Sequence, residues 1–287
     1  MSSSYRPELT DTGLAPTVAV IAVDEYQNSR EMHIADEQPL TIYIDSHEIV
    51  TLMTLGTYPE LLTLGYIKNQ GLIDDLEEIK SIQVDWEVHA AAVTTFTDKD
   101  DWQEKLGPRI VTTGCGQGTV FGNIMEQLEG VELTPLKLKQ SGIYALLKNL
   151  NAYNEVYKNA GAVHGCALCQ GTEIMMFIED VGRHNAVDAI AGKMWLEAIS
   201  GEDKLFYTTG RLTSEMVIKV AQMGIPALLS RSGITQMGLK LAQDLGVTML
   251  SRAKGKHFLI YNGMENIEFD VNLPPKLEVA HIRTSKQ

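Results

Sequence analysis

The sequence has few cysteines, and its positively charged residues are fewer than its negatively charged ones. Three cysteines occur in 287 residues, namely Cys115, Cys166 and Cys169. A cysteine number that is small and odd excludes the disulfide framework of small secreted proteins. The 24 Lys and Arg residues stand against 37 Asp and Glu residues, so the formal net charge is -13. This charge disfavours non-specific binding to nucleic acid, and we expect no nucleic-acid partner.

Long apolar runs are also missing. No segment approaches the roughly 20 apolar residues of a membrane-spanning helix. The first residues, MSSSYRPELTDTG, contain no apolar core of a signal peptide. We therefore expect a soluble cytoplasmic protein with reduced thiols and no membrane partner. The hydrophobic fraction of 44% is nevertheless sufficient for one large core or two modest ones.

The first half of the chain predicts a small β-rich lobe. Residues 1–14 are Ser-rich and predict a disordered tail, and the lobe follows over residues 15–134. A helix is expected to begin at Pro59 and to end before Gly71, which is the usual placement of these two residue types. Strands are expected in the apolar or alternating segments 17–26, 40–45 and 81–96.

Residues 135–287 predict an α/β domain. A helix is expected over residues 137–159 and a hairpin over residues 163–180. Strand–turn–helix units then repeat, with strands at 205–209, 227–230 and 247–251, helices between them, and a final strand at 258–261. Repeated units of this kind indicate a mixed, mostly parallel sheet covered by helices.

Three of the expected turns carry an arginine directly after a strand: Arg183, Arg211 and Arg231. In a parallel sheet such turns share the carboxyl edge, where helix N-termini favour anions and arginine binds phosphate in bidentate fashion. The sequence therefore predicts a site for a nucleotide or a phosphorylated cofactor, although any single arginine could instead form a surface salt bridge. Further candidate residues for this site are His164, His184, Asn185, Ser214, Ser230, Ser232, Arg252, Ala253, Lys254, Gly255, Lys256 and His257. Asn185 and Asp188 also fit the N-cap and N3 positions of the helix that begins there.

Cys166 and Cys169 form a C-x-x-C pattern, with His164 two residues upstream. This pattern permits a zinc or a redox interpretation. If the segment is a strand, however, side chains three residues apart point to opposite faces of the sheet. We favour two separate buried cysteines and expect no bound metal.

Cys115 lies in the glycine-rich segment TTGCGQG. Thiolate chemistry requires access and mobility, and both are supplied by neighbouring glycines. A glycine loop is equally compatible with a plain turn. The residues alone leave both interpretations open.

Several segments together resemble the FdhD family, the formate dehydrogenase accessory sulfurtransferases. The resemblance extends from about residue 37 to residue 261, and its most specific part is EDVGRHNAVDAIAG. Other matching segments, in order along the chain, are EQPLTIYID, YPELLTLGYIKNQGLI, TGCGQG, GAVHGCAL, TGRLTSEMVIKVAQMGIPALLSRSGIT and GVTMLSRAKGKHFLIY.

The resemblance implies a two-lobed homodimer with a cytidine-deaminase-like core. It implies that Cys115 carries sulfur as a persulfide from a cysteine desulfurase to the molybdenum cofactor, which is then inserted into formate dehydrogenase. The bound substrate would be Mo-bis-molybdopterin guanine dinucleotide, with a guanine nucleotide as a mimic. The family's loop usually contains a second cysteine, and Gly118 stands at that position here.

Two functions from different classes therefore remain. The first is a sulfurtransferase that uses Cys115. The second is a divergent family member that binds a guanine nucleotide or pterin cofactor without transferring sulfur. A zinc deaminase requires H-x-E and P-C-x-x-C at two helix starts. The matching positions hold HNA and GRLTSEM without thiols, which excludes that activity.

Overall fold

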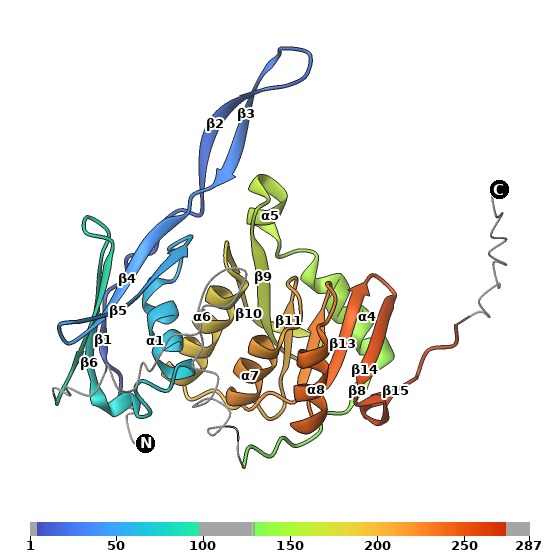
Figure 1. Ribbon diagram of the computed structural model, residues 1–287. Coiled ribbons are helices and arrows are strands. Elements are labelled where there is room, and N and C mark those ends of the chain that lie inside the picture. Colours follow the sequence, from blue (N-terminus) through green and yellow to red (C-terminus); the bar gives the residue numbers. More distant parts are fainter. Residues whose placement is uncertain (1–4, 98–127, 129, 274–287) are drawn as a thin grey trace, which may run out of the picture.

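The structure, a computed structural model, describes residues 5–97, 128 and 130–273. Figure 1 shows a β-rich N-terminal lobe beside an α/β domain. A hairpin of β2 (Thr17–Val23) and β3 (Ser29–Ala35) projects away from both. Within the described residues, no helix combines the length and the apolar character that crossing a membrane requires.

The N-terminal lobe is a five-stranded sheet in the order β1-β6-β7-β4-β5, covered on one face by α1 (Pro59–Asn69). The strands are β1 (Glu8–Leu9), β4 (Gln38–Ile44), β5 (His47–Thr54), β6 (Ile79–Asp85) and β7 (Ala90–Thr95), and a short 3₁₀ turn, η1 (Leu76–Glu78), precedes β6. Alternate residues of β4 are fully buried, because successive side chains of a strand point to opposite faces. The predicted strands and the helix that begins at Pro59 are confirmed.

Residues 5–14 run along this sheet. β1 pairs in parallel with β6, the Tyr5 hydroxyl donates to Ile79 O at 2.6 Å, and the Leu14 N–H donates to Gly56 O at 2.8 Å. The prediction of a disordered tail is wrong for these residues. Their polar composition conceals that a sheet edge can bind a segment through its backbone alone.

The α/β domain contains a six-stranded sheet in the order β10-β9-β11-β12-β13-β14. Its strands are β9 (His164–Gln170), β10 (Glu173–Asp180), β11 (Leu205–Thr208), β12 (Ala227–Ser230), β13 (Thr248–Lys254) and β14 (His257–Asn262). Four strands, β10 to β13, run in the same direction, while β9 and β14 run in the opposite direction. The expected mixed sheet is confirmed, but it is less parallel than predicted, because two hairpins contribute antiparallel neighbours.

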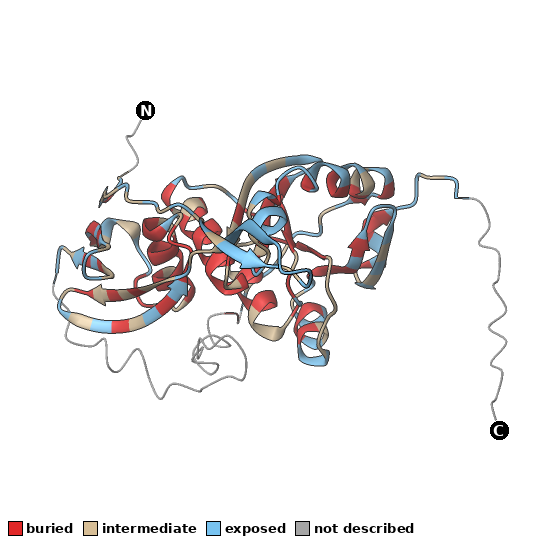
Figure 2. Cartoon of the chain, turned by 90° about the horizontal axis from the view of Figure 1, so that it is seen from above, coloured by how far each residue is buried: buried red, intermediate tan, exposed pale blue. Residues whose placement is uncertain are grey.

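Helices cover both faces of this sheet. On one face lie α6 (Arg183–Leu196), α7 (Ser214–Gln222) and α8 (Gln236–Asp244), and α4 (Gln140–Leu150) covers the other. The single helix expected over residues 137–159 is instead two, α4 and α5 (Glu155–Ala160), separated by a turn. Figure 2 shows that the buried residues concentrate in the strands and in the inner sides of these helices. The short strands β8 (Leu138–Lys139) and β15 (Ile267–Glu268) pair beside α4, with a 3₁₀ turn, η2 (Met264–Asn266), before β15.

The two lobes meet where α1 crosses α6. A Cβ atom on Gly65 would lie 1.7 Å from Asp188 O, and one on Gly192 would lie 2.0 Å from Leu61 O. The two glycines therefore allow the helix backbones to touch. One cluster of buried hydrophobic residues extends across this junction, from Leu40 in the N-terminal sheet to Met249 in β13.

Candidate functional site

The end of β11, the turn after β12 and the later part of β13 are joined by backbone hydrogen bonds. The Arg231 N–H donates to Thr208 O at 3.1 Å, and the Arg252 N–H donates to Ser232 O at 3.0 Å. Because these strands are parallel, their carboxyl ends lie at the same edge of the sheet. The predicted gathering of arginines along one edge is therefore present, but Arg252 lies within β13 and not in the turn after it.

Ser230 links two of these turns from below. Its buried hydroxyl donates to Gly210 O at 2.6 Å and accepts the Ser232 N–H at 2.9 Å. Both hydrogen bonds are made within the protein. The sequence predicts that Ser230 binds the ligand. In the structure, its hydroxyl instead connects the two turns.

A pocket of about 400 Å³ opens at this edge. The structure brings together four of the predicted binding residues in its wall: His164, Arg231, Ser232 and Arg252. The other lining residues are Asn154, Tyr157, Val163, Gly165 and Thr209. Two arginines, a histidine and a hydroxyl around one opening form a surface suited to an anion.

The two arginines are held in different ways. Arg231 is half-buried and hydrogen-bonds Tyr207, whose pKa is raised to about 12 by burial although Arg231 opposes the shift. Arg252 is exposed and has a left-handed φ of 54°, an uncommon conformation for a residue other than glycine. Its guanidinium lies over Gly233, where an added Cβ would be 3.4 Å from Nη2.

His164 begins β9 and is half-buried in the pocket wall, with its Nδ1 atom 3.4 Å from Thr209 Oγ1. Burial lowers the pKa of His164, and the charges of Arg183 and Arg211 lower it further. The ring is therefore neutral at neutral pH. The same effect shows that Arg183 and Arg211 act electrostatically on this site from outside the pocket wall.

Arg183 and His184 lie beneath the pocket. Arg183 packs against Gly210, where an added Cβ would lie 2.7 Å from Arg183 Cδ. The His184 Nε2 atom is 3.1 Å from Glu215 Oε2. Burial, followed by the charges of Lys219 and Arg183, lowers the pKa of His184 to about 2, so the ring is neutral and this contact is not an ion pair.

The predicted roles of Asn185 and Asp188 at the helix start are wrong. Helix α6 begins at Arg183 with Gly182 as its N-cap, so Asn185 lies inside the first turn. Its Nδ2 group donates to Met53 O at 2.7 Å and to Asp180 Oδ1 at 2.8 Å. Asn185 therefore joins α6 to the end of β5 and is not in the pocket wall.

The remaining predicted residues lie around the pocket but do not line it. Arg211 is exposed, and Ser214 is the half-buried first residue of α7. Ala253 is fully buried in the cluster that faces α4. Lys254, Gly255, Lys256 and His257 are exposed in the β13–β14 turn, which Figure 1 shows at the same end of the sheet. Their charges can attract an anion, whereas the side chain of Ala253 cannot contact one.

Sequence reasoning missed the two acidic residues of the EDVGRHN segment. Asp180 accepts hydrogen bonds from Thr54 Oγ1 at 2.6 Å, from Leu55 N at 3.1 Å and from Gly182 N at 2.9 Å. Burial raises its pKa, and these hydrogen bonds oppose the shift. Glu179 accepts the backbone N–H groups of Val156 and Tyr157, each at 2.9 Å, and so fixes the start of α5. Both residues position the elements around the site.

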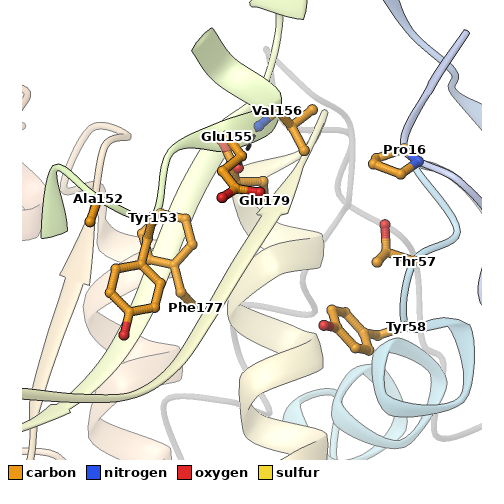
Figure 3. A pocket seen from close by; sticks show the side chains of 9 residues that line it. All are labelled: Pro16, Thr57, Tyr58, Ala152, Tyr153, Glu155, Val156, Phe177 and Glu179. Atoms are coloured by element: carbon orange, nitrogen blue, oxygen red, sulfur yellow. Dashed lines mark hydrogen bonds between the residues drawn. The ribbon is translucent and has the colours of Figure 1, made fainter. Parts of the chain in front are cut away.

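A second pocket, of about 480 Å³, lies on the other side of the segment that leads into α5 (Figure 3). Tyr153, Phe177 and Glu179 face it from the α/β domain, and Pro16, Thr57 and Tyr58 face it from the N-terminal lobe. Its ionisable lining groups other than tyrosine are the carboxylates Glu155 and Glu179. An anion is therefore expected in the first pocket and not here.

The two cysteines of the C-x-x-C pattern lie on opposite faces of the sheet. Cys166 belongs to the cluster beneath α6 and α7, and Cys169 belongs to the cluster beneath α4. Burial raises the pKa of each thiol to about 12. The prediction of two separate buried cysteines is confirmed, and neither is suited to thiolate chemistry. Cys115 lies outside the described residues.

Comparison with known proteins identifies the family. Residues 35–268 match the model of the FdhD/NarQ family. The chain belongs to this family. A relative named sulfur carrier protein FdhD, from Listeria monocytogenes serotype 4b, is 31% identical over 241 residues, which cover 83% of this chain and 92% of the relative. The protein of the same name from Bacillus subtilis is 27% identical, with 83% and 91% covered.

A solved FdhD/NarQ-like structure supports the same assignment. This crystal structure, of a protein from Desulfotalea psychrophila described as a formate dehydrogenase accessory protein, has a TM-score of 0.69 and 28% sequence identity. The match covers 88% of this chain and 98% of that chain. The resemblance carried by the sequence motifs is thus confirmed. The FdhD/NarQ match includes the pocket residues and Cys115, and it begins at Ala35, the last residue of β3.

Proposed function

We propose that this protein is a sulfur carrier for formate dehydrogenase. Cys115 would accept sulfur from a cysteine desulfurase and pass it to the molybdenum cofactor, in the form of Mo-bis-molybdopterin guanine dinucleotide. Membership of the FdhD/NarQ family supports the sulfur-carrier role. The observation that carries the cofactor part of the proposal is the pocket that Arg231, Arg252 and His164 line.

The pocket fits part of such a substrate. Its volume of about 400 Å³ lies in the range of small-molecule sites, about 300–1,000 Å³. This space suits one nucleotide-sized end of the cofactor. Arg231 and Arg252 would bind phosphate oxygens bidentately, and Ser232 would add a hydroxyl. Arg211, Lys254 and Lys256 are exposed near the ends of strands at the same edge of the sheet, where they would attract the polyanion over a distance limited by salt.

The first chemical step is an exchange between two sulfur centres. The Cys115 thiolate attacks the outer sulfur of the donor's persulfide. A new S–S bond forms at Cys115, the S–S bond of the donor breaks, and the donor leaves as its thiolate. No electrons are gained or lost overall. Because the attacking sulfur must reach the donor directly, this step requires an accessible cysteine. The two other cysteines are buried and do not meet this requirement.

Mass spectrometry tests this assignment. After incubation with a cysteine desulfurase and cysteine, the peptide that contains Cys115 should gain one sulfur, about 32 Da, which reducing agent removes. Cys166 and Cys169 serve as internal controls and should stay unlabelled, because burial raises their pKa values to about 12. A sulfur label on Cys166 or Cys169 without a label on Cys115 would show that Cys115 is not the carrier.

A second candidate function is cofactor binding without sulfur transfer. It is favoured by Gly118, which stands where related loops have a second cysteine, and by the location of the pocket in the α/β domain. Under this alternative, wild-type protein would bind a guanine nucleotide but acquire no persulfide. Under the first proposal, Cys115→Ala would keep nucleotide binding and lose the persulfide.

The domain type and the partners follow from the same proposal. The succession of β9 to β13 with α6, α7 and α8 between the parallel strands supports a cytidine-deaminase-like core. Cytoplasmic location and a homodimeric assembly stay predictions. Formate dehydrogenase would receive the sulfurated cofactor.

A further inference from the structure

The second pocket, between the two lobes, has a chemistry opposite to that of the first. Its volume is about 480 Å³, and its described lining residues include two carboxylates, Glu155 and Glu179, and no basic residue. Three aromatic rings, those of Tyr58, Tyr153 and Phe177, also line it (Figure 3). Carboxylates beside aromatic faces favour a cation. The proposed sulfur transfer does not use this pocket.

The aromatic rings lie on both sides of the opening. Tyr153 and Phe177 form one side, with ring centroids 5.5 Å apart and planes inclined by 39°. Tyr58 lies on the other side, at the start of α1 (Figure 3). Tyr58 and Tyr153 are each 44% exposed, so part of each ring is accessible to a ligand. A cation is attracted to the face of such a ring, and this protein contains one example, because Lys68 Nζ lies 4.9 Å from the ring centroid of Trp195.

The described part of the chain does not neutralise the two carboxylates of this pocket. Glu179 accepts the backbone N–H groups of Val156 and Tyr157, which fix its position but are not cations. Glu155 is exposed at the first residue of α5. Among the described residues, neither carboxylate forms an ion pair with Lys, Arg or His. The negative charge is therefore available to a ligand.

Thr57 adds a hydrogen-bonding group to the side formed by the N-terminal lobe. Its Oγ1 atom is buried and has no hydrogen-bond partner among the residues that the structure describes. A buried polar atom without a partner costs free energy. A ligand that donates an N–H group to this oxygen removes that cost. The pocket thus offers acceptors from both lobes.

A guanidinium group suits this combination better than an ammonium group. Its flat face stacks on aromatic rings, and the N–H donors along its edge fit a carboxylate bidentately. An ammonium group is a more strongly hydrated point charge without such a face. The volume of about 480 Å³ also exceeds what one arginine side chain fills, so room remains for the residues beside it in a peptide.

We propose that the pocket between the lobes binds an arginine side chain of a partner protein. The guanidinium group stacks on the exposed tyrosine rings, pairs with Glu155 and donates to Thr57. Charge complementarity supports a basic segment as the ligand, because the chain has a net charge of -13 and this pocket adds uncompensated carboxylates. A segment bound here contacts both lobes, since Tyr58 belongs to one and Tyr153 to the other.

Peptides that differ in one group test the class of ligand. The probe is acetyl-Gly-Arg-Gly-amide, and its matched control contains citrulline, which has a neutral group of nearly the same shape. In ligand-observed NMR titrations of the full-length protein, the citrulline peptide should bind about tenfold more weakly, because it loses the cation–π contact and the ionic hydrogen bonds. The lysine peptide should lie between the two. Free L-arginine should bind more weakly than the tripeptide, since it lacks the flanking residues and brings a carboxylate to an acidic pocket.

Two variants test the location. Glu155→Gln removes a charge at constant side-chain length, and Tyr153→Leu removes a partly exposed ring. Each should weaken binding of the arginine peptide about three- to tenfold. Glu173→Gln is the matched control, because it removes an exposed carboxylate of β10 that does not line the pocket, and it should leave the affinity unchanged. Thermal unfolding confirms that all three variants are folded.

Three results would overturn the proposal. Equal affinities for the arginine and citrulline peptides would show that the pocket does not select a cation. An affinity for the arginine peptide that both Glu155→Gln and Tyr153→Leu leave unchanged would place the binding elsewhere. Tighter binding of free L-arginine than of the tripeptide would assign the pocket to a free amino acid. None of these measurements involves GDP or a persulfide on Cys115, so this proposal and the sulfur-carrier proposal fail independently.

Discussion

The pocket at the sheet edge and the buried polar layer of α6 and α7 differ in what their charged residues contact. In the pocket, Arg252 is exposed and Arg231 is half-buried at the opening. In the layer below, Asp188 is fully buried and accepts two hydrogen bonds from Lys219, at 2.7 and 2.8 Å, and one from Asn69 at 2.7 Å. The charges of Asp188 and Lys219 are thus paired within the protein.

This difference separates the residues that would bind a ligand from the residues that hold the pocket in place. A buried charge must be paired, because removing it from water costs several kcal/mol. A charge at a pocket wall stays hydrated until a ligand replaces the water. Substitutions below the pocket should therefore reduce stability first, and substitutions in its wall should reduce binding first.

The largest effect is expected from breaking the buried ion pair. Lys219→Met leaves Asp188 without its cation, and it should lower the free energy of unfolding by about 3–5 kcal/mol. Burial raises the pKa of Asp188 and Lys219 lowers it, so the carboxyl group should become protonated in the variant. Urea unfolding measures the loss.

Lys193→Met is the matched control for this experiment. Lys193 pairs with Glu197 one turn away on the surface of α6, and such a pair contributes about 0.5 kcal/mol or less. A loss for Lys219→Met as small as that of Lys193→Met would contradict the distinction between the two layers.

The second largest effect concerns binding. Arg231→Ala should weaken the binding of GDP about ten- to a hundredfold, because hydrogen bonds to charged groups contribute about 1.5–3 kcal/mol. Arg231→Lys should restore part of the affinity, since lysine lacks the bidentate geometry. Titration calorimetry measures both.

Arg211→Ala sharpens the same comparison. Arg211 is exposed and does not line the pocket, so its removal should weaken GDP binding less than Arg231→Ala does, and the loss should shrink with added salt. Equal losses for the two arginines would place the ligand outside the pocket.

The third effect is a pH dependence of stability. The pKa of His184 is about 2 in the folded protein, below its ordinary value of 6.5. Between these values the unfolded chain binds more protons, so the free energy of unfolding falls as the pH drops below 6.5, by up to about 1.4 kcal/mol per pH unit. His184→Gln should flatten this slope in urea unfolding between pH 6.5 and 4.5. Parallel curves for the two proteins would show that another group is responsible.

The smallest effect is expected at the buried cysteines. Cys166→Ala and Cys169→Ala should each lower the free energy of unfolding by about 1 kcal/mol, the value of a small buried group. Because the two side chains lie on opposite faces of the sheet, the losses should add in the double variant. Sulfur loading of the folded protein should be unchanged, and a loss of loading beyond the loss of folded protein would give these thiols a chemical role.

Sequence patterns predicted the elements well where periodicity was strong. The hairpin at residues 163–180, the helices after it and the separation of Cys166 from Cys169 follow from local alternation and turn residues. The position of residues 5–14 could not be predicted, because their contribution is backbone pairing with β6. The division of α4 from α5 was also missed, since Glu179 of a different strand fixes the start of α5.

Within the site, sequence order identified the edge but not the depth of each residue. His164, Arg231, Ser232 and Arg252 reach the pocket, whereas Arg183, His184 and Asn185 lie beneath it. All seven lie at or near strand ends at the same edge, so spacing alone cannot separate them. The separation depends on contacts with α7 and with the end of β5, which are distant in sequence.

The crossing of α1 and α6 limits how the lobes can move. With the backbones in contact at Gly65 and Gly192, neither helix can slide along the other without steric overlap. Rotation about the contact point is the motion that remains. Within the α/β domain, Ser230 joins the pocket turns, so a ligand that enters the pocket meets turns whose geometry is already set, and little of its binding energy is spent on ordering the site. Preorganisation of this kind favours tight binding, because the ordering cost has already been met when the chain folds.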